Sequence, residues 1–173
     1  LSELALRNNG HTVQVDYANG STMAVGGKSY KLLQFHFHTP SEHLVDGKRY
    51  PLEMHLVHKG DDGTLAVAGV MIEPGAANIA LQEIWGHLPR KAGEKKKVAG
   101  VAINARDLLP DTDSYRHYKG SLTTPPCSEG VRWFVLDRPI EASAGQIATI
   151  AGIMGANARP SQPLNERLVI SAQ

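Results

Sequence analysis

Two histidines separated by a single residue, His36 and His38, alternate with Phe35 and Phe37 in the segment 34–38. If this segment is a β-strand, successive side chains point to opposite faces of the sheet, so the histidines share one face and the phenylalanines share the other. Residues two apart on one face lie about 6.6 Å apart along the strand, and two imidazoles at that separation can bind one metal ion. We expect the phenylalanines to be buried behind them and to hold the strand in place.

A second segment, residues 52–58, offers a third histidine. Its alternation places Glu53, His55 and Val57 on one face. That face combines an acid, a histidine and a small apolar side chain, which suits the wall of a catalytic cavity. His58 falls on the opposite face, and we expect it to have a structural role.

In both segments a polar residue stands two positions before a histidine: Gln34 before His36, and Glu53 before His55. Such a side chain can hydrogen-bond the second ring nitrogen and fix the orientation of a metal-binding imidazole. An isolated His-x-His pair also occurs by chance on exposed strands, and this chain has eight histidines. The third histidine and the two polar partners favour a zinc site over that alternative.

Three neutral histidines without a fourth protein ligand are typical of a catalytic zinc site, in which one coordination position stays open. The single cysteine, Cys127, excludes a cysteine-rich structural site. Zinc held in this way lowers the pKa of its bound water to about 7, so that hydroxide is available at neutral pH. Such a hydroxide attacks small electrophilic carbons.

The elements that must position these residues are mostly strands. Alternating polar and apolar patterns and short apolar runs predict strands at 11–17, 30–38, 52–58, 65–72, 98–103 and 131–136. Apolar residues at helical spacing predict helices at 76–88 and 143–154. Asn9-Gly10 and Asn19-Gly20 indicate turns, and for Asn19-Gly20-Ser21 the turn is favoured over a glycosylation sequon. The outline is a mainly β, largely antiparallel protein with a few short helices.

Length and composition are those of one globular domain spanning residues 1–173, without repeats or linkers. A net charge of +1 gives no reason to expect a nucleic acid or an acidic membrane as partner. No run approaches the roughly 18 apolar residues of a membrane span, and the first residues do not resemble a signal peptide. We expect the basic run Lys95–Lys97 to be a solvated loop or a sheet edge.

Several blocks of sequence together resemble the signature of the α-class carbonic anhydrases of bacterial type. The blocks are residues 34–38, 41–43, 53–58, 118–127 and 157–165. They stand in the family's order and cover nearly the whole chain. The resemblance implies a large, twisted, mostly antiparallel central sheet with short surface helices, and zinc in a conical cleft. It also implies the reversible hydration of carbon dioxide to bicarbonate by zinc-bound hydroxide, with slow hydrolysis of activated esters as a side activity.

The resemblance assigns roles that spacing alone does not give. His36, His38 and His55 match the zinc ligands, and Gln34 and Glu53 match their hydrogen-bond partners. Thr123 and Glu42 match a pair in which the threonine accepts a hydrogen bond from the zinc hydroxide and donates its own proton to the glutamate. His11 matches the proton shuttle at the cavity mouth, where an imidazole with a pKa of about 6.5 both accepts and releases a proton at neutral pH.

Other positions match the walls of the active-site cavity. The apolar pocket beside the zinc is matched by Val57, Val67, Leu122, Val131 and Trp133, and the bicarbonate and inhibitor contact by Thr124. Asn9 and Gln14 match positions that order the waters of the proton path. Without the resemblance, Glu42 would be interpreted as a loop acid, Thr123 as a turn residue, His11 as a strand residue and the apolar positions as ordinary core.

The chain departs from the family pattern at its start, where an aromatic-rich segment and a Ser-Pro block are missing. Bacterial members of this type pair a cysteine at the Cys127 position with one in that segment, which implies an exported, periplasmic protein and, from the family, a homodimer. Two alternatives stay open: a non-catalytic binding module related to the family, and a protein that uses zinc only structurally. The presence of all three histidines, Glu42 and Thr123 argues against the first, and the second would tolerate loss of Glu42 and Thr123.

Overall fold

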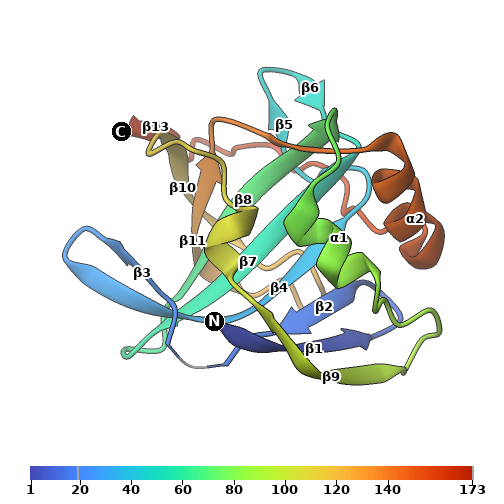
Figure 1. Cartoon of the computed structure of the whole chain (residues 1–173). Helices are drawn as coiled ribbons and strands as arrows, with labels where there is room; N and C mark the ends of the chain where they lie inside the picture. Colours follow the sequence, from blue (N-terminus) through green and yellow to red (C-terminus); the bar gives the residue numbers. More distant parts are fainter. Residues whose placement is uncertain (19, 173) are drawn as a thin grey trace.

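The computed structural model describes residues 1–18 and 20–172 (Figure 1). Its strands are β1 Ser2–Asn8, β2 Val13–Asp16, β3 Thr22–Val25, β4 Lys28–His38, β5 Leu44–Val45, β6 Lys48–Arg49, β7 Leu52–Gly60, β8 Leu65–Pro74, β9 Lys95–Ile103, β10 Tyr115–Ser121, β11 Glu129–Leu136, β12 Ile140–Ala142 and β13 Ile170–Ala172. Its helices are α1 Ile79–Trp85, the 3-10 helix η1 Ala105–Leu108 and α2 Ala144–Met154. The candidate sequon and turn at Asn19 lie outside the described residues.

One large sheet organises the described chain. Its strand order is β13-β10-β11-β8-β7-β4-β2-β1-β9, with β12 also paired to β8 and β3 to β4. Only the β11–β8 and β12–β8 pairs are parallel. β5 and β6 form a separate small hairpin. The predicted fold class, a large and mostly antiparallel sheet with short surface helices, is therefore confirmed.

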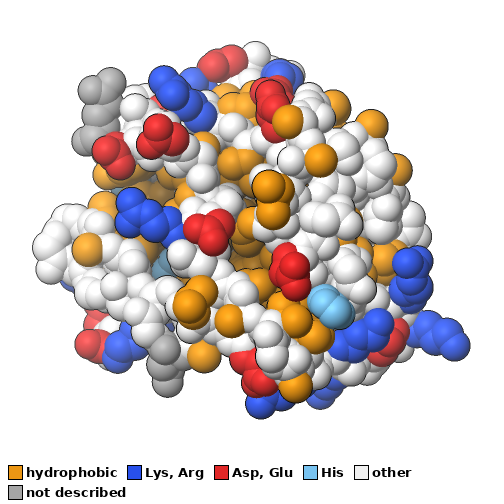
Figure 2. Space-filling view, in the orientation of Figure 1, with side chains coloured by type: hydrophobic (Ala, Val, Ile, Leu, Met, Phe, Trp, Pro, Cys, Tyr) orange, Lys and Arg blue, Asp and Glu red, His pale blue; other side chains and the backbone are white. Residues whose placement is uncertain are grey.

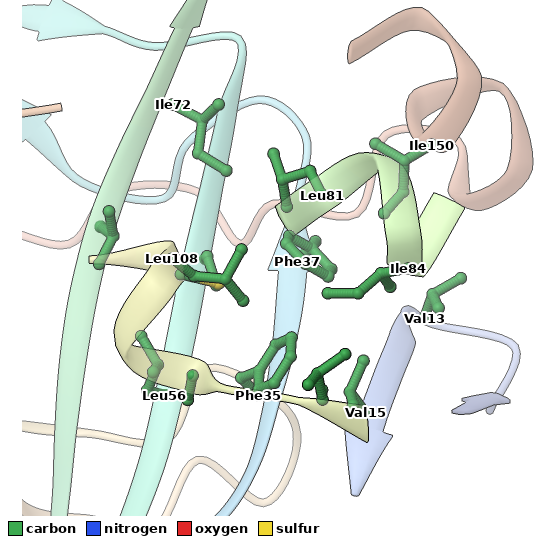
Figure 3. Close-up of a cluster of buried hydrophobic side chains, with 14 of the residues drawn as sticks. Val13, Val15, Phe35, Phe37, Leu56, Ile72, Leu81, Ile84, Leu108 and Ile150 are labelled. Carbon is green, nitrogen blue, oxygen red and sulfur yellow. The ribbon is translucent and has the colours of Figure 1, made fainter. Parts of the chain in front are cut away.

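The helices cover one face of this sheet (Figure 1). In Figure 3, Phe37 of β4 points toward Leu81 and Ile84 of α1, with Ile150 of α2 beside them. Phe35 of β4 lies below Phe37, and Leu56 of β7 lies next to η1, which carries Leu108. All of these side chains are nearly inaccessible to solvent. Burial of apolar side chains against the helices fixes which face of β4 and β7 turns inward. The histidine-bearing face is therefore the opposite one.

Both helices start later than the sequence predicts, and α1 is also shorter. Asn78 caps α1 by accepting a hydrogen bond from the Leu81 backbone, so the helix covers Ile79–Trp85 and not 76–88. Ser143 caps α2 in a reciprocal capping box with Gln146, so this helix agrees with 143–154 to within one residue. In both cases a side chain that satisfies free backbone N–H groups sets the start of the helix.

The predicted strands all exist, but with shifted ends, and several strands have no counterpart in the prediction. The strand expected at 11–17 covers only Val13–Asp16, and that expected at 98–103 begins at Lys95. The strands that were not predicted are β1, β3, β5, β6, β10, β12 and β13.

The basic run Lys95–Lys97 lies on β9, an edge of the large sheet, as expected. Figure 2 shows basic side chains gathered at the lower right, where Figure 1 places β9 and the loop before it. Charged side chains on an edge strand discourage pairing with another chain.

Within residues 1–18 and 20–172, no helix is long and apolar enough to cross a membrane.

Candidate metal centre and catalytic cavity

The antiparallel pairing of β4 and β7 brings the three predicted histidines together. His36 lies directly opposite His55, and His38 opposite Glu53. Each of the three rings offers a nitrogen that lies within 4.8 Å of the other two. Histidine side chains grouped at this distance can bind a single metal ion.

Polar neighbours occupy the second nitrogen of two of the rings. Nδ1 of His36 lies 2.8 Å from Oε1 of Gln34, and Nε2 of His55 lies 2.8 Å from Oε1 of Glu53. This leaves Nε2 of His36 and Nδ1 of His55 available. The third ring, His38, is buried, and neither of its nitrogens has a hydrogen-bond partner within the described residues.

Nδ1 of His38 lies 3.3 Å from Oε1 of Glu42, but no hydrogen bond from the described residues replaces the hydration that this buried imidazole loses. A metal ion bound by His38 would supply the missing interaction. Burial also lowers the pKa of His36 well below its ordinary value and that of His38 to about 3, so both rings are neutral, as metal ligands must be. The donor set of three neutral imidazoles suits zinc.

A hydrogen-bonded chain that was not predicted extends from this site to a neighbouring cavity. Oε1 of Glu53 lies 2.6 Å from Nδ1 of His43, whose Nε2 lies 2.6 Å from the hydroxyl of Tyr118. Burial raises the pKa of the Glu53 carboxyl, but His43 and His55 outweigh burial and hold the pKa well below its ordinary value. Glu53 is therefore a buried carboxylate that holds two histidines.

The three histidines lie at a cavity of about 670 Å³ on the face of the sheet opposite the helices. Of the residues expected in its pocket, five line the cavity: Val57, Val67, Leu122, Thr124 and Trp133. Val131 is not among the lining residues; it is 1% exposed and packs in the same apolar cluster as Val57, Val67 and Trp133. One wall of the cavity is thus apolar.

Glu42 and Thr123 lie close to the histidines, but the expected hydrogen bond between them is not formed. Oε1 of Glu42 accepts a hydrogen bond from the backbone N–H of Arg159 at 2.8 Å. Oε2 is buried, lies 3.9 Å from Nδ1 of His55 and, among the described residues, has no hydrogen-bond partner. Thr123 lines both the main cavity and an adjoining cavity of about 350 Å³ that Glu42 also lines. The free Oε2 atom is the acceptor that the expected bond would use.

His11 lies at the cavity, exposed to solvent. Asn9 and Gln14, the positions expected to order water, also line the cavity. Cys127 is free within the described residues and is half-buried at the cavity wall. His58 is buried on the other side of β7, where its Nδ1 lies 2.9 Å from the Leu56 carbonyl oxygen.

Three histidines that could hold a metal ion lie on adjacent strands of one large sheet, beside a cavity with an apolar wall. A sequence profile described as eukaryotic-type carbonic anhydrase matches residues 1–173. A carbonic anhydrase of Nostoc sp. is 51% identical over 169 residues, which are 98% of this chain and 64% of that protein. One from Pectobacterium carotovorum is 49% identical over 94% of this chain and 67% of that protein. The chain belongs to the eukaryotic-type, or α-class, carbonic anhydrase family and spans about two thirds of the length of these relatives.

Solved structures agree with this assignment. The α-carbonic anhydrase of Thermovibrio ammonificans, in complex with the inhibitor sulfanilamide, superposes with a TM-score of 0.94 at 44% identity, covering 98% of this chain and 75% of that one. The α-carbonic anhydrase of Photobacterium profundum gives a TM-score of 0.92 at 48% identity, covering 96% of this chain and 76% of that one.

Proposed function

We propose that this protein catalyses the reversible hydration of carbon dioxide to bicarbonate and a proton. The observation that carries the proposal is the group of three histidines beside a cavity with an apolar wall, one of them without a hydrogen-bond partner among the described residues. Carbon dioxide has neither a charge nor a net dipole, so an apolar wall suits it. Relatives at about 50% identity that bear the name carbonic anhydrase support the same reaction.

His36, His38 and His55 would hold a zinc ion, oriented by Gln34 and Glu53. When bound, zinc in a tris-histidine site lowers the pKa of water to about 7 and supplies a nucleophile at neutral pH. Because Gln34 bonds Nδ1 of His36 and Glu53 bonds Nε2 of His55, the other nitrogen of each ring would face the ion. Without them each ring could rotate or change tautomer.

Thr123 and Glu42 orient the reacting oxygen in this proposal. The Arg159 backbone fixes one oxygen of the Glu42 carboxylate and leaves Oε2 to accept from the Thr123 hydroxyl. A threonine hydroxyl that donates its hydrogen bond to Glu42 can only accept a hydrogen bond from the attacking group. Directing a lone pair at the substrate carbon in this way lowers the barrier through orientation.

His11 would carry the released proton from the cavity to solvent. Its ring is exposed, and Asn9 and Gln14 on the same cavity offer polar groups to intervening water.

Thr124 and the apolar residues Val57, Val67, Leu122 and Trp133 would contact substrate, with Val131 supporting them.

Replacing Thr123 tests the mechanism. We expect Thr123→Ala to lower kcat/KM for hydration about 100-fold, comparable to the loss of one oriented polar group in other active sites. Thr123→Ser keeps the hydroxyl and should retain most of the activity. Stopped-flow assays on both variants, each with one zinc per chain, make the comparison. Unchanged hydration in Thr123→Ala would rule out the assigned role.

The resemblance to the family supports further proposals. We propose that residues 1–173 act as one domain, that the protein is periplasmic or otherwise exported, and that it forms a homodimer. Slow hydrolysis of activated esters and inhibition by sulfonamides should accompany the main activity, because esters and sulfonamides would reach the same ion. Light scattering tests the homodimer, and a mass of one chain at micromolar concentration would contradict it.

A further inference from the structure

The side chain of Asn157 is bonded to three separate points of the backbone. Its Oδ1 accepts a hydrogen bond from the Thr39 N–H at 2.8 Å. Its Nδ2 donates to the carbonyl oxygens of His11 at 2.8 Å and of Phe37 at 3.1 Å. The backbone N–H of Asn157 also donates to the Thr39 carbonyl at 3.0 Å. Both hydrogens and the oxygen of this amide are therefore used.

These contacts lie where β4 loses one of its neighbours. β2 pairs with β4 only from Gln34 to His36, so the hydrogen-bond ladder between these two strands ends before Phe37. The Phe37 carbonyl instead accepts from Asn157 and from the Thr12 hydroxyl, the latter at 2.6 Å. Phe37 and Thr39 flank His38, so Asn157 holds the backbone on both sides of that histidine.

The third contact fixes the backbone of His11. The N–H of His11 donates to Oδ1 of Asn9 at 2.9 Å, and its carbonyl accepts from Asn157. The peptide groups on both sides of His11 are thereby held, while its ring remains exposed at the cavity. A fixed backbone with a free ring is what a group that turns between cavity and solvent requires.

We propose that Asn157 is a positioning residue that fixes the backbone of His11 relative to the strand end that carries His38. It thereby sets the distance over which a proton passes from the metal site to His11. The effect on proton transfer rests on the proposed function. The fixed backbone of His11 does not. Asn157 itself exchanges no proton and touches no reacting atom.

The test compares Asn157→Ala with Gln162→Ala. Gln162 lies on the same loop, and within residues 1–18 and 20–172 its amide donates only to the Pro160 carbonyl, at 2.8 Å. This control therefore removes an amide of similar type without releasing a distant segment. Asn157→Asp is the second variant: it keeps an acceptor for Thr39 but loses both donors, and it replaces Asn157→Ala if that protein does not fold. Each protein is loaded with one zinc per chain.

We expect kcat in dilute buffer to fall about tenfold in Asn157→Ala and kcat/KM to fall by a clearly smaller factor, the smaller loss arising from the released contacts beside His38. Added imidazole should restore kcat because it accepts the proton directly. NMR relaxation should show lower order for the backbone N–H groups of His11 and Thr12 in Asn157→Ala, but not in Gln162→Ala.

Unchanged kcat together with unchanged order at His11 and Thr12 would overturn the proposal. So would equal losses in kcat and kcat/KM that imidazole does not restore, since these would place the effect at the metal site or in the fold. If the native protein itself does not hydrate carbon dioxide, the proposed function fails. The relaxation measurement would then still decide whether Asn157 positions His11.

Discussion

At the scale of single residues, β7 places two histidines in opposite environments. His55 faces the cavity and is held by Glu53, whereas His58 is buried on the other face against its own strand. Sequence alternation predicted this division correctly because strand side chains alternate strictly. It could not reveal that His43 and Tyr118 continue the hydrogen-bonded chain from Glu53, because His43 lies outside any predicted strand and Tyr118 lies on β10, which was not predicted.

His58 should make stability depend on pH. Burial lowers its pKa below the ordinary 6.5, so between 6.5 and the lower folded value the unfolded chain binds more protons than the folded one. The free energy of unfolding therefore falls as the pH falls through this window. In His58→Gln, urea unfolding from pH 7 to pH 5 should show a smaller loss of stability than in the native protein. Parallel pH curves for the two proteins would contradict this interpretation.

At the scale of elements, the strands that carry the site were predictable and those that close the cavity were less so. β4 and β7 have regular alternation of aromatic or apolar with polar residues, which sequence reports directly. β10, Tyr115–Ser121, has polar residues on both faces and was not predicted. The Arg159 contact to Glu42 joins residues 117 positions apart, and only the fold brings them together.

Gly69 on β8 shows how closely the strands pack behind the site. It lies opposite His55, and a Cβ atom at this position would stand 3.1 Å from Oε1 of Glu53 and 3.9 Å from the Trp133 ring. Gly69→Ala should therefore displace the Glu53 carboxylate and weaken zinc binding about tenfold, which is the usual effect of losing a residue that hydrogen-bonds a metal ligand. Competition with a chelator measures the affinity.

Gly152 in α2 provides the control for this prediction. A Cβ atom there meets nothing within 4 Å, and alanine is favoured over glycine in a helix by about 0.5–1 kcal/mol. Gly152→Ala should therefore bind zinc like the native protein and be no less stable. Equal zinc affinity in Gly69→Ala and Gly152→Ala would show that Glu53 tolerates the added methyl group.

At the scale of the whole molecule, one sheet separates two environments. Its helix-covered face holds the main apolar core, and its other face holds the histidines and the cavity. The class of fold and the family were predictable because several short motifs, spread over the chain, occur together in order. The absence of a Thr123–Glu42 hydrogen bond was not predictable, because it depends on the relative placement of two loops.

The proposed function requires that His36, His38 and His55 hold a zinc ion and that the loaded protein hydrates carbon dioxide. Stopped-flow hydration by the purified protein, with its zinc content measured in the same sample, tests this claim directly. We expect hydration far above the uncatalysed rate that is lost on chelation, returns with zinc, and is absent in His38→Ala. One zinc per chain without hydration above the uncatalysed rate would contradict the claim and favour a protein that binds zinc without catalysis.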